Sequence, residues 1–181
     1  MPSYCEYIRA HPEDEYNRRY HDEEYGFPLA DDNLLFERLV LEINQAGLSW
    51  LLILKKQPAF QRAFEGFDVA RVAAYDGEDV ARLLADASII RNRRKIEAVI
   101  ENARRIPAIQ KEYDSFKAWL DAHHPRSHEE WVKLFKQTFV FVGGEVVREF
   151  LVSTGYLPNA HDADCPVYAR ITALDPAWMR G

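Results

Sequence analysis

The sequence predicts an all-α protein, and three observations lead to this prediction. Apolar residues recur at intervals of three and four positions along nearly the whole chain, which is the period of an amphipathic helix. Proline, glycine or a capping residue interrupts this pattern about every ten to twenty residues, which is typical of short helices joined by tight corners. The one segment that alternates like a strand, residues 139–142, is short and alone, so we interpret it as a buried connector.

Length and composition fit a single domain, which we expect to span residues 1–181. With 48% hydrophobic and 13% aromatic residues the chain can bury a substantial core, so disorder is not expected. The net charge of −6 argues against a polyanion-binding surface spread over the whole molecule. It leaves room for a local basic patch.

The N-terminus is polar and lacks the apolar segment of a signal peptide, and the best apolar run, residues 51–54, is far too short to cross a membrane. We therefore expect a cytoplasmic protein without a membrane partner. The two cysteines, Cys5 and Cys165, lie near opposite ends of the chain. In a reducing compartment free thiols or metal ligands are favoured over a disulfide.

The first well-defined helix is expected to begin at a cap formed by Asp31 or Asp32 and to end at Gly47. Ser49 can then cap the next helix, which begins at Trp50. The two helices meet at a tight corner, so residues near the end of the first and the start of the second come close together.

One stripe of the first helix carries an unexpected charge. Leu35, Leu39, Glu42 and Ala46 share a face, and an ionised carboxylate on an apolar face is costly unless a cation or a hydrogen-bond donor meets it. Two interpretations stay open. Glu42 is a core glutamate paired with a local donor and Trp50 is a core ring, or the two belong to a binding site. The spacing alone favours the core interpretation.

Further helices follow from local signals. Pro58 is suited to the first position of a helix that carries Phe60 and Phe64, and Asp68 and Asp76 each open a short helix. Later caps and helix signals complete the all-α pattern: a helix with Ile96, Val99, Ile100 and Ala103 on one face, a cap at Ser115, a capping box formed by Ser127 and Glu130, and a helix from Glu145 that ends at Gly155.

Two pairs of residues raise the question of a metal site. Three residues separate His161 from Cys165, a ligand spacing that zinc sites use, and Cys5 and His21 form a second pair. Together they are a Cys₂His₂ set that suits tetrahedral, structural zinc and would fasten the two chain ends. The alternative is two ordinary thiols and two surface histidines, which the long separation of the pairs favours.

Three more features could belong to a functional site. The glycines after Val142, Gly143 and Gly144, precede a helix, so this turn suits a phosphate, although a tight inter-helix turn is the simpler explanation. The densest positive patch contains Arg91, Arg93, Arg94 and Lys95, and most such runs are solvated faces. Tyr7, Tyr20 and Tyr25 would lie close to a metal held by Cys5 and His21.

Taken together, these residues resemble the DNA-3-methyladenine glycosylase I family. The matching segments are residues 20–26, 41–50, 89–96 and 139–143 and the pair His161 and Cys165, which follow the family's order and cover most of the chain. The string Glu-x-x-Gln-Ala-Gly-Leu-Ser-Trp that begins at Glu42 is highly specific. The chain departs from the family at Tyr7 and Tyr25, where tryptophan is usual.

The resemblance implies a helix-hairpin-helix DNA glycosylase fold whose terminal segments, residues 1–30 and 156–181, are fastened by zinc. It implies these zinc ligands: Cys5, His21, His161 and Cys165. The DNA-backbone hairpin would be Val142, Gly143 and Gly144. Glu42 would be the catalytic pocket carboxylate that reads the damaged base, Trp50 the ring that stacks on it, and Tyr20, Tyr25 and Tyr7 further base-binding aromatics.

The activity implied by the resemblance is hydrolytic excision of 3-methyladenine from alkylated double-stranded DNA, by a monomer that flips the base out and leaves an abasic site. No lysine stands beside the hairpin glycines, so the enzyme is expected to be monofunctional. Asp162 is expected to orient or be solvated rather than to catalyse. The alternative is a zinc-stabilised module that binds DNA damage without cleaving it, an interpretation that rests on the departures at Tyr7 and Tyr25.

Overall fold

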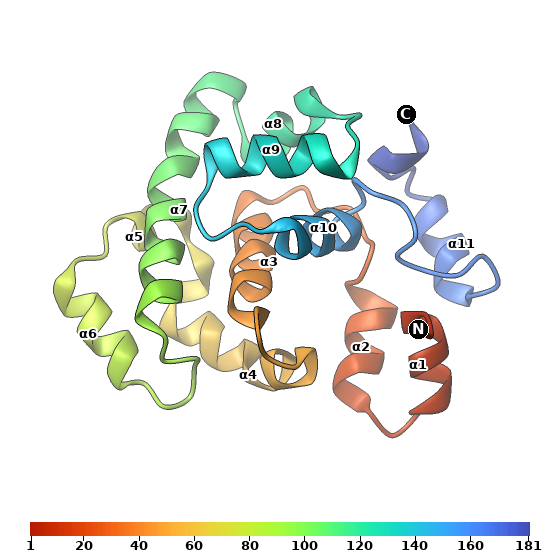
Figure 1. Cartoon of the computed structure of the whole chain (residues 1–181), viewed down its shortest axis with the longest axis horizontal. Helices are drawn as coiled ribbons and strands as arrows, with labels where there is room; N and C mark the ends of the chain where they lie inside the picture. Colours follow the sequence, from red (N-terminus) through yellow and green to blue (C-terminus); the bar gives the residue numbers. More distant parts are fainter.

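A computed structural model describes all 181 residues and confirms the all-α prediction, since it contains helices and no strand. The α-helices are α1 (Tyr4–Ala10), α2 (Glu15–Glu23), α3 (Asp32–Gln45), α4 (Trp50–Ala63), α5 (Val69–Ala73), α6 (Gly77–Ala85), α7 (Arg93–Tyr113), α8 (Phe116–His123), α9 (His128–Thr138), α10 (Gly144–Ser153) and α11 (Pro166–Thr172). Two 3₁₀ turns, η1 (Glu65–Phe67) and η2 (Ala177–Met179), complete the fold (Figure 1).

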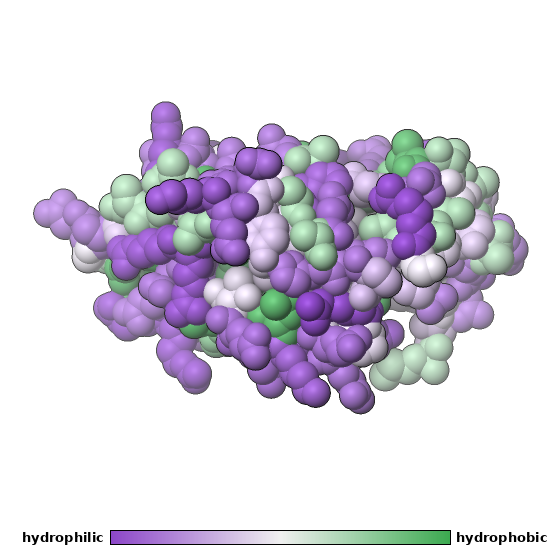
Figure 2. All heavy atoms as spheres, turned by 90° about the horizontal axis from the view of Figure 1, so that it is seen from above, coloured by the Kyte–Doolittle hydropathy of each residue, from purple (hydrophilic) through white to green (hydrophobic).

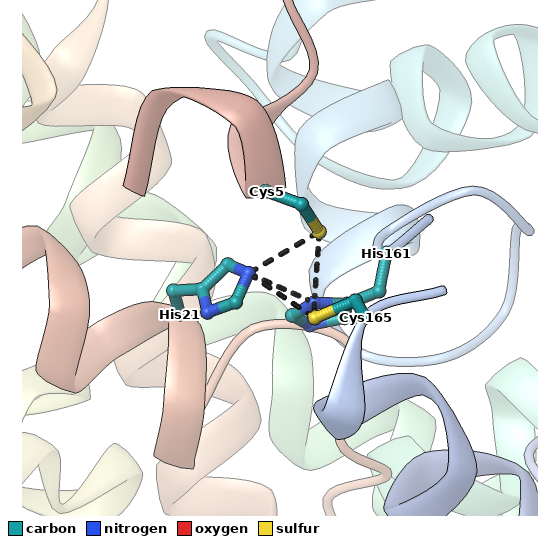
Figure 3. Close-up of side chains that lie close together, drawn as sticks. All are labelled: Cys5, His21, His161 and Cys165. Atoms are coloured by element: carbon teal, nitrogen blue, oxygen red, sulfur yellow. Dashed lines mark hydrogen bonds between the residues drawn. The ribbon is translucent and has the colours of Figure 1, made fainter. Parts of the chain in front are cut away.

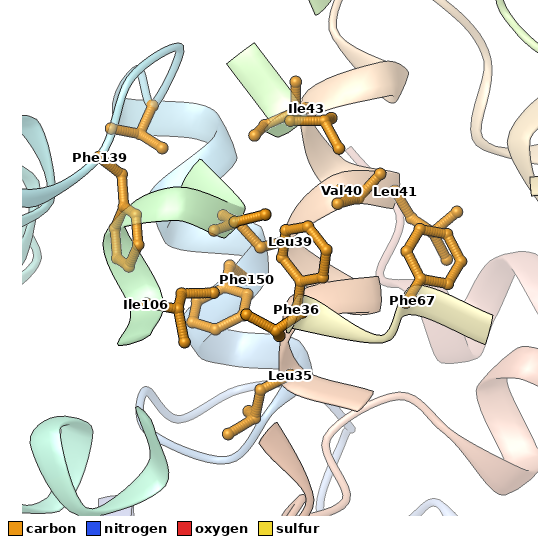
Figure 4. Packing of buried hydrophobic residues seen from close by; sticks show 14 of the residues in the cluster. Leu35, Phe36, Leu39, Val40, Leu41, Ile43, Phe67, Ile106, Phe139 and Phe150 are labelled. Atoms are coloured by element: carbon orange, nitrogen blue, oxygen red, sulfur yellow. The ribbon is translucent and has the colours of Figure 1, made fainter. Parts of the chain in front are cut away.

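Helix α3 lies at the centre and packs against α4, α7, α8 and α10 (Figure 1). Every residue from Leu35 to Asn44 is buried, so α3 is covered on all sides, as expected of a core helix. Phe36 and Leu39 pack with Phe150 of α10 and with the aromatic rings around them (Figure 4). On the surface, by contrast, apolar side chains occur only in small groups among hydrophilic ones, as the face in Figure 2 shows.

The predicted caps are confirmed. Asp31, Ser49, Asp68 and Asp76 each precede a helix and accept a hydrogen bond from a backbone amide of its first turn. Ser115 does the same, and Ser127 and Glu130 form the expected capping box. Such a cap stabilises a helix by about 1 kcal/mol, and the contacts are local, which explains why the sequence alone reveals them.

Two predicted helix boundaries are wrong. Pro58 does not begin a helix but lies inside α4, which runs from Trp50 to Ala63. The cost of proline there is offset because Ile53, Leu54 and Phe60 on both sides of it are buried in the core. Helix α10 begins one residue earlier than predicted, at Gly144, and ends at Ser153 before the left-handed Gly155.

The connector between α9 and α10 forms no strand, as predicted, because a side chain replaces the missing sheet partner. The amide nitrogen of Asn102, in α7, donates to the carbonyl of Val140 at 3.0 Å, and its carbonyl oxygen accepts from the Val140 amide at 2.8 Å. Phe139 and Val142 are buried, whereas Phe141 is half-buried, so the segment is only partly the buried connector that we expected.

The two chain ends meet beside α2. Figure 1 shows α1 and α2 next to α11 at one end of the molecule, where Cys5, Cys165, Val167 and Ile171 form a small apolar cluster. Gly26 makes this approach possible, because it is left-handed and a Cβ there would lie 2.7 Å from that of Ala160. None of the helices combines the length and apolar composition needed to span a bilayer.

Candidate metal centre and active site

Cys5, His21, His161 and Cys165 converge, although they come from α1, α2 and the segment that leads into α11 (Figure 3). All four are buried, and their candidate ligand atoms lie within 4.8 Å of one another. The two imidazole nitrogens, Nε2 of His21 and Nδ1 of His161, are 3.2 Å apart. The sulfur atoms lie 3.3 to 3.8 Å from these nitrogens.

These distances fit a four-coordinate metal ion. Bonds of about 2.05 Å to nitrogen and 2.3 Å to sulfur give tetrahedral edges of about 3.3 Å between nitrogens and about 3.5 Å between nitrogen and sulfur. The observed separations match those edges, so the four residues could hold a metal ion without rearrangement. The alternative of two surface histidines is wrong, because His21 and His161 are 3% and 7% exposed.

Neighbouring polar groups orient the candidate metal ligands. The Nδ1 of His21 lies 2.7 Å from Oδ1 of Asp22, and the Nε2 of His161 lies 2.7 Å from the Tyr25 carbonyl. These acceptors hold the N–H of each ring and leave the other nitrogen free to bind. The Asp162 amide donates to the Cys5 sulfur at 3.3 Å. Burial raises the pKa of the Cys5 thiol to about 12, so the thiolate needs a cation beside it.

Glu42 lies where the sequence placed it, on α3 and 3% exposed, and its carboxylate has neither a hydrogen-bond donor nor an ion-pair partner. Arg38, one turn earlier, donates instead to the Ser153 carbonyl at 3.0 Å and lies 3.5 Å from Glu24. Burial, together with the nearby charge of Glu149, raises the pKa of Glu42 to about 8. The local donor required by the core interpretation is therefore missing.

Aromatic rings stand beside this carboxylate. The Tyr20 and Trp50 ring centroids are 5.1 Å apart at 65°, and Tyr25 lies 5.7 Å from Tyr20. The guanidinium of Arg38, one turn before Glu42 on α3, lies 5.2 Å from the centre of the Tyr20 ring, so Tyr20 covers this face of α3. Burial raises the pKa of Tyr20, Arg38 lowers it, and the Glu42 carboxylate raises it. The Tyr20 hydroxyl is buried without a hydrogen-bond partner. Two unpartnered polar groups thus share a buried, aromatic-walled site.

Tyr7 lies at the edge of this group, and Tyr4 connects it to the other rings. The Tyr7 ring stacks on Tyr4 at 6.3 Å and on His11 at 4.3 Å, and its hydroxyl donates to Asp14 at 2.9 Å. Tyr4 itself has its ring centroid 5.1 Å from that of Tyr25 and 6.4 Å from that of Tyr20. Tyr4 is not among the residues that the sequence predicts for this site, although its position directly before Cys5 is a signal that points to it.

The predicted hairpin lies between α9 and α10. Val142 is buried, Gly143 is exposed, and α10 begins at Gly144 with no side-chain cap, so its first amides are free to bind an acceptor. A hollow of about 640 Å³ lies here, and residues 139–146, Ala46 and Lys136 line it. The same hollow thus joins the hairpin to the corner that follows α3.

The basic cluster divides into two parts. Arg91, Arg93 and Arg94 are exposed, as expected of a solvated face, and the Arg94 guanidinium lies 5.8 Å from the centre of the Phe141 ring. Lys95 is different, since it is 5% exposed and its Nζ donates to the carbonyls of Asn44 and Ala46, both at 2.7 Å. It therefore satisfies the last carbonyls of α3, and the solvated-face interpretation is wrong for this residue.

Asp162 lies beside the metal cluster. Its carboxylate accepts from the Ser3 hydroxyl at 2.6 Å and lies 3.4 Å from the Arg9 guanidinium, so it connects the loop before α11 to α1. These contacts agree with the orienting role that we predicted for it.

Comparison with solved structures first defines the class of fold. A Staphylococcus aureus 3-methyladenine DNA glycosylase I, described for its recognition of 3-methyladenine, is similar with a TM-score of 0.77 and 34% identity, over 84% of this chain and 91% of that one. A solution structure of a 3-methyladenine DNA glycosylase I is similar with a TM-score of 0.74 and 32% identity, over 92% of this chain and all of that one. The fold is therefore that of these DNA glycosylases.

Sequence comparison then gives the family. Residues 10–168 match the family described as methyladenine glycosylase. The DNA-3-methyladenine glycosylase 1 of Escherichia coli K12 is 36% identical over 168 residues, which are 82% of this chain and 89% of that protein. The DNA-3-methyladenine glycosylase of Haemophilus influenzae is 34% identical over 81% of this chain and 89% of its own length. The chain belongs to the methyladenine glycosylase family.

Proposed function

We propose that the protein is a monofunctional DNA glycosylase that excises 3-methyladenine from alkylated double-stranded DNA. The observation that carries this proposal is Glu42, a buried carboxylate without a partner on the face of α3 that Tyr20 covers, and Tyr20 in turn contacts Trp50. The relatives named above support the substrate, since they are 3-methyladenine glycosylases by name.

The pocket suits a cation. Methylation at N3 gives adenine a positive charge, and a cationic ring is held well between electron-rich aromatic faces and a carboxylate. Because the pKa of Glu42 is about 8, the free pocket holds a proton near neutral pH. A cationic base can stabilise the ionised carboxylate once this proton has left, whereas neutral adenine carries no positive charge to pair with it. The same pocket would therefore reject the undamaged base.

The hairpin would hold the DNA while the base is extruded. The target bond is inaccessible inside the duplex, so the nucleotide must rotate out of the stack into the pocket. Gly143 and Gly144 leave the first amides of α10 free for a backbone phosphate, and buried Val142 anchors the turn. The positive charge on the base has already weakened the glycosyl bond. Water adds to the sugar carbon, the neutral base leaves, and one proton passes to solvent.

The positions of the lysines favour hydrolysis over β-elimination, because β-elimination needs a nucleophilic lysine at the site. No lysine is adjacent to the hairpin glycines in sequence, and Lys136, which lines the hairpin hollow, is exposed on α9. A nucleophilic lysine is usually desolvated or placed beside another cation. We therefore expect borohydride to trap no covalent protein–DNA species, and trapping that is lost in Lys136→Ala would contradict a monofunctional enzyme.

We propose that the metal held by the Cys/His cluster is zinc. Two thiolates and two imidazoles at tetrahedral separations are a typical zinc ligand set. With four protein ligands no position is left for water, so the ion would be structural and would tie residues 1–30 to residues 156–181. Elemental analysis of purified protein should find one zinc per chain. Less than about half an equivalent would contradict this assignment.

The test of the activity is release of free base from methylated duplex DNA. We expect release by the wild type, acting as a monomer in the cytoplasm, and much slower release by Glu42→Gln. Specific binding of methylated duplex without release would instead favour a non-cleaving damage-binding module. Of the two departures that suggested such a module, Tyr25 contacts Tyr20 directly, whereas Tyr7 reaches the aromatic group only through Tyr4.

A further inference from the structure

A second carboxylate faces the pocket from α10. Helix α10 packs on α3, and the two lie side by side in Figure 1. Glu149 of α10 is half-buried, and the Tyr25 hydroxyl donates to its Oε2 at 3.5 Å. The Tyr25 ring itself touches Tyr20, which stands beside Glu42 and Trp50. Glu149 is thus linked to the wall of the base pocket through a single side chain.

The carboxylates in this part of the molecule form no ion pair. None of the carboxylates of Glu42, Glu149 and Glu145 has a lysine, arginine or histidine nitrogen within ion-pair distance, although eleven such pairs exist elsewhere. Glu145 and Glu149 are one turn apart and share a face of α10. Among the three, Glu42 is 97% buried and unpartnered, which indicates a ligand rather than an acidic surface.

We propose that Glu149 is a specificity-determining residue of the base pocket, a second carboxylate held in place by Tyr25 that favours a positively charged base over a neutral one. This inference rests on the proposed function and adds to it. Glu42 alone can accept a hydrogen bond from either kind of base, whereas a second negative charge at the pocket wall is felt only by a cation. Discrimination by charge would then come from two helices, α3 and α10.

The charges around Glu149 agree with this role. Burial and then Glu145 raise the pKa of Glu149, while Arg148 and the Tyr25 hydroxyl act in the opposite direction. After burial, Glu149 is the strongest influence that raises the pKa of Glu42, Arg38 lowers it, and Glu145 adds a smaller increase. Ionising both carboxylates in the empty pocket is therefore unfavourable, and a cation that enters between them removes the repulsion.

Tyr25 is the positioning residue for this second carboxylate. Its ring is held by edge contacts with Tyr4 at 5.1 Å and His161 at 5.6 Å, so its hydroxyl has a fixed direction. Phenylalanine at this position would keep the ring contacts and lose the donor. A comparison of tyrosine with phenylalanine at position 25 therefore separates the packing of the ring from the placement of Glu149 by the hydroxyl.

The experiment compares two probes that differ in one charge. Calorimetry measures the binding of 3,9-dimethyladeninium, a permanent cation, and of neutral 9-methyladenine to the zinc-loaded wild type and to Glu149→Gln. We expect Glu149→Gln to lower the preference for the cation about tenfold at pH 9, where Glu42 is ionised. Tyr25→Phe should give a smaller loss in the same direction. Glu112→Gln, which removes an exposed charge at the end of α7, is the control and should keep the wild-type preference.

The pH dependence separates this role from a structural one. Without Glu149, the pKa of Glu42 falls, so Glu42 stays ionised at lower pH and the deficit of Glu149→Gln should shrink between pH 9 and pH 6.5. An equal loss for both probes, or a deficit that does not change with pH, would show a packing role and overturn the proposal. A preference equal to that of Glu112→Gln would also overturn it.

The result also distinguishes this inference from the proposed function. A wild type that prefers the cationic probe but releases no base from methylated DNA would refute the glycosylase activity and leave the role of Glu149 intact. A wild type that releases base, with an unchanged preference in Glu149→Gln, would refute only the inference. If the wild type binds neither probe, the pocket is not a base site and both fail.

Discussion

Replacing Glu42 with glutamine should make the fold more stable at alkaline pH while it impairs the proposed function. The amide has nearly the shape of the carboxylate and cannot ionise. In the wild type, the carboxylate is 3% exposed and has no cation or donor, so each ionised molecule carries an uncompensated buried charge. The variant removes that charge and keeps the packing of α3.

The size of the effect follows from the pKa. Burial raises the pKa of Glu42 from an ordinary 4.5 to about 8, so the folded protein holds this proton more tightly than the unfolded chain does. The free energy of unfolding should therefore fall as pH rises from 4.5 to 8, and it should level off above 8. At about 1.4 kcal/mol for each factor of ten in proton affinity, the full difference is on the order of 5 kcal/mol.

The assay is urea denaturation of the wild type and Glu42→Gln at several values between pH 5 and pH 9. Titrating groups away from the pocket, including the metal ligands, affect both proteins alike, so the difference between the two curves reports Glu42 together with its coupling to Glu149. We expect Glu42→Gln to gain about 4 kcal/mol relative to the wild type between pH 5 and pH 9. Parallel curves would refute the reasoning, because they would show that Glu42 is not a buried, unpaired carboxylate.

Three further outcomes are expected. Chelation of the proposed zinc should lower the melting temperature and expose residues 1–30 and 156–181 to protease first, and an unchanged melting temperature would count against a structural metal. Lys95→Met should cost about 2 kcal/mol in urea unfolding, since it leaves the carbonyls of Asn44 and Ala46 unpaired, and wild-type stability would show that water replaces the ammonium. Tyr7→Phe should release base within about twofold of the wild type, because the ring contacts stay and only a partly buried hydrogen bond to Asp14 is lost, and a larger loss would show that the Tyr7 hydroxyl contributes to the pocket.

The features that the sequence predicted well depend on near neighbours in the chain. Asp31, Ser49 and Ser127 cap helices through amides two or three residues away, so the residue type and its spacing are sufficient. Glu42 was recognised as a buried charge for the same reason, because helical periodicity fixes its face. The boundary at Pro58 was wrong because tertiary packing carries α4 through the proline, and no local signal reports that packing.

The features that were missed depend on tertiary contact. Lys95 reads as one more residue of a basic run, and only the placement of α7 against the end of α3 makes it a buried donor. Tyr4 and Tyr7 are three residues apart on α1, and the direction of that helix decides which ring meets Tyr20. Glu149 stands on an ordinary amphipathic helix, and its contact with Tyr25 spans 124 positions.

The metal cluster lies between these cases. The residues themselves offer a Cys₂His₂ set made of two pairs, but the long separation of His161 and Cys165 from Cys5 and His21 favours the ordinary interpretation. The family resemblance favours the metal site instead, and the fold brings the four ligand atoms within 4.8 Å.

The most direct test of the account is single-turnover release of 3-methyladenine from an alkylated duplex by zinc-loaded protein. We predict that the wild type releases the free base and leaves an abasic site. Glu42→Gln should be slower by about 10- to 100-fold, the worth of a hydrogen bond to a charged group. No release above background from folded, zinc-loaded wild type would contradict the proposed activity. An unchanged rate in Glu42→Gln would contradict the central role of the buried carboxylate.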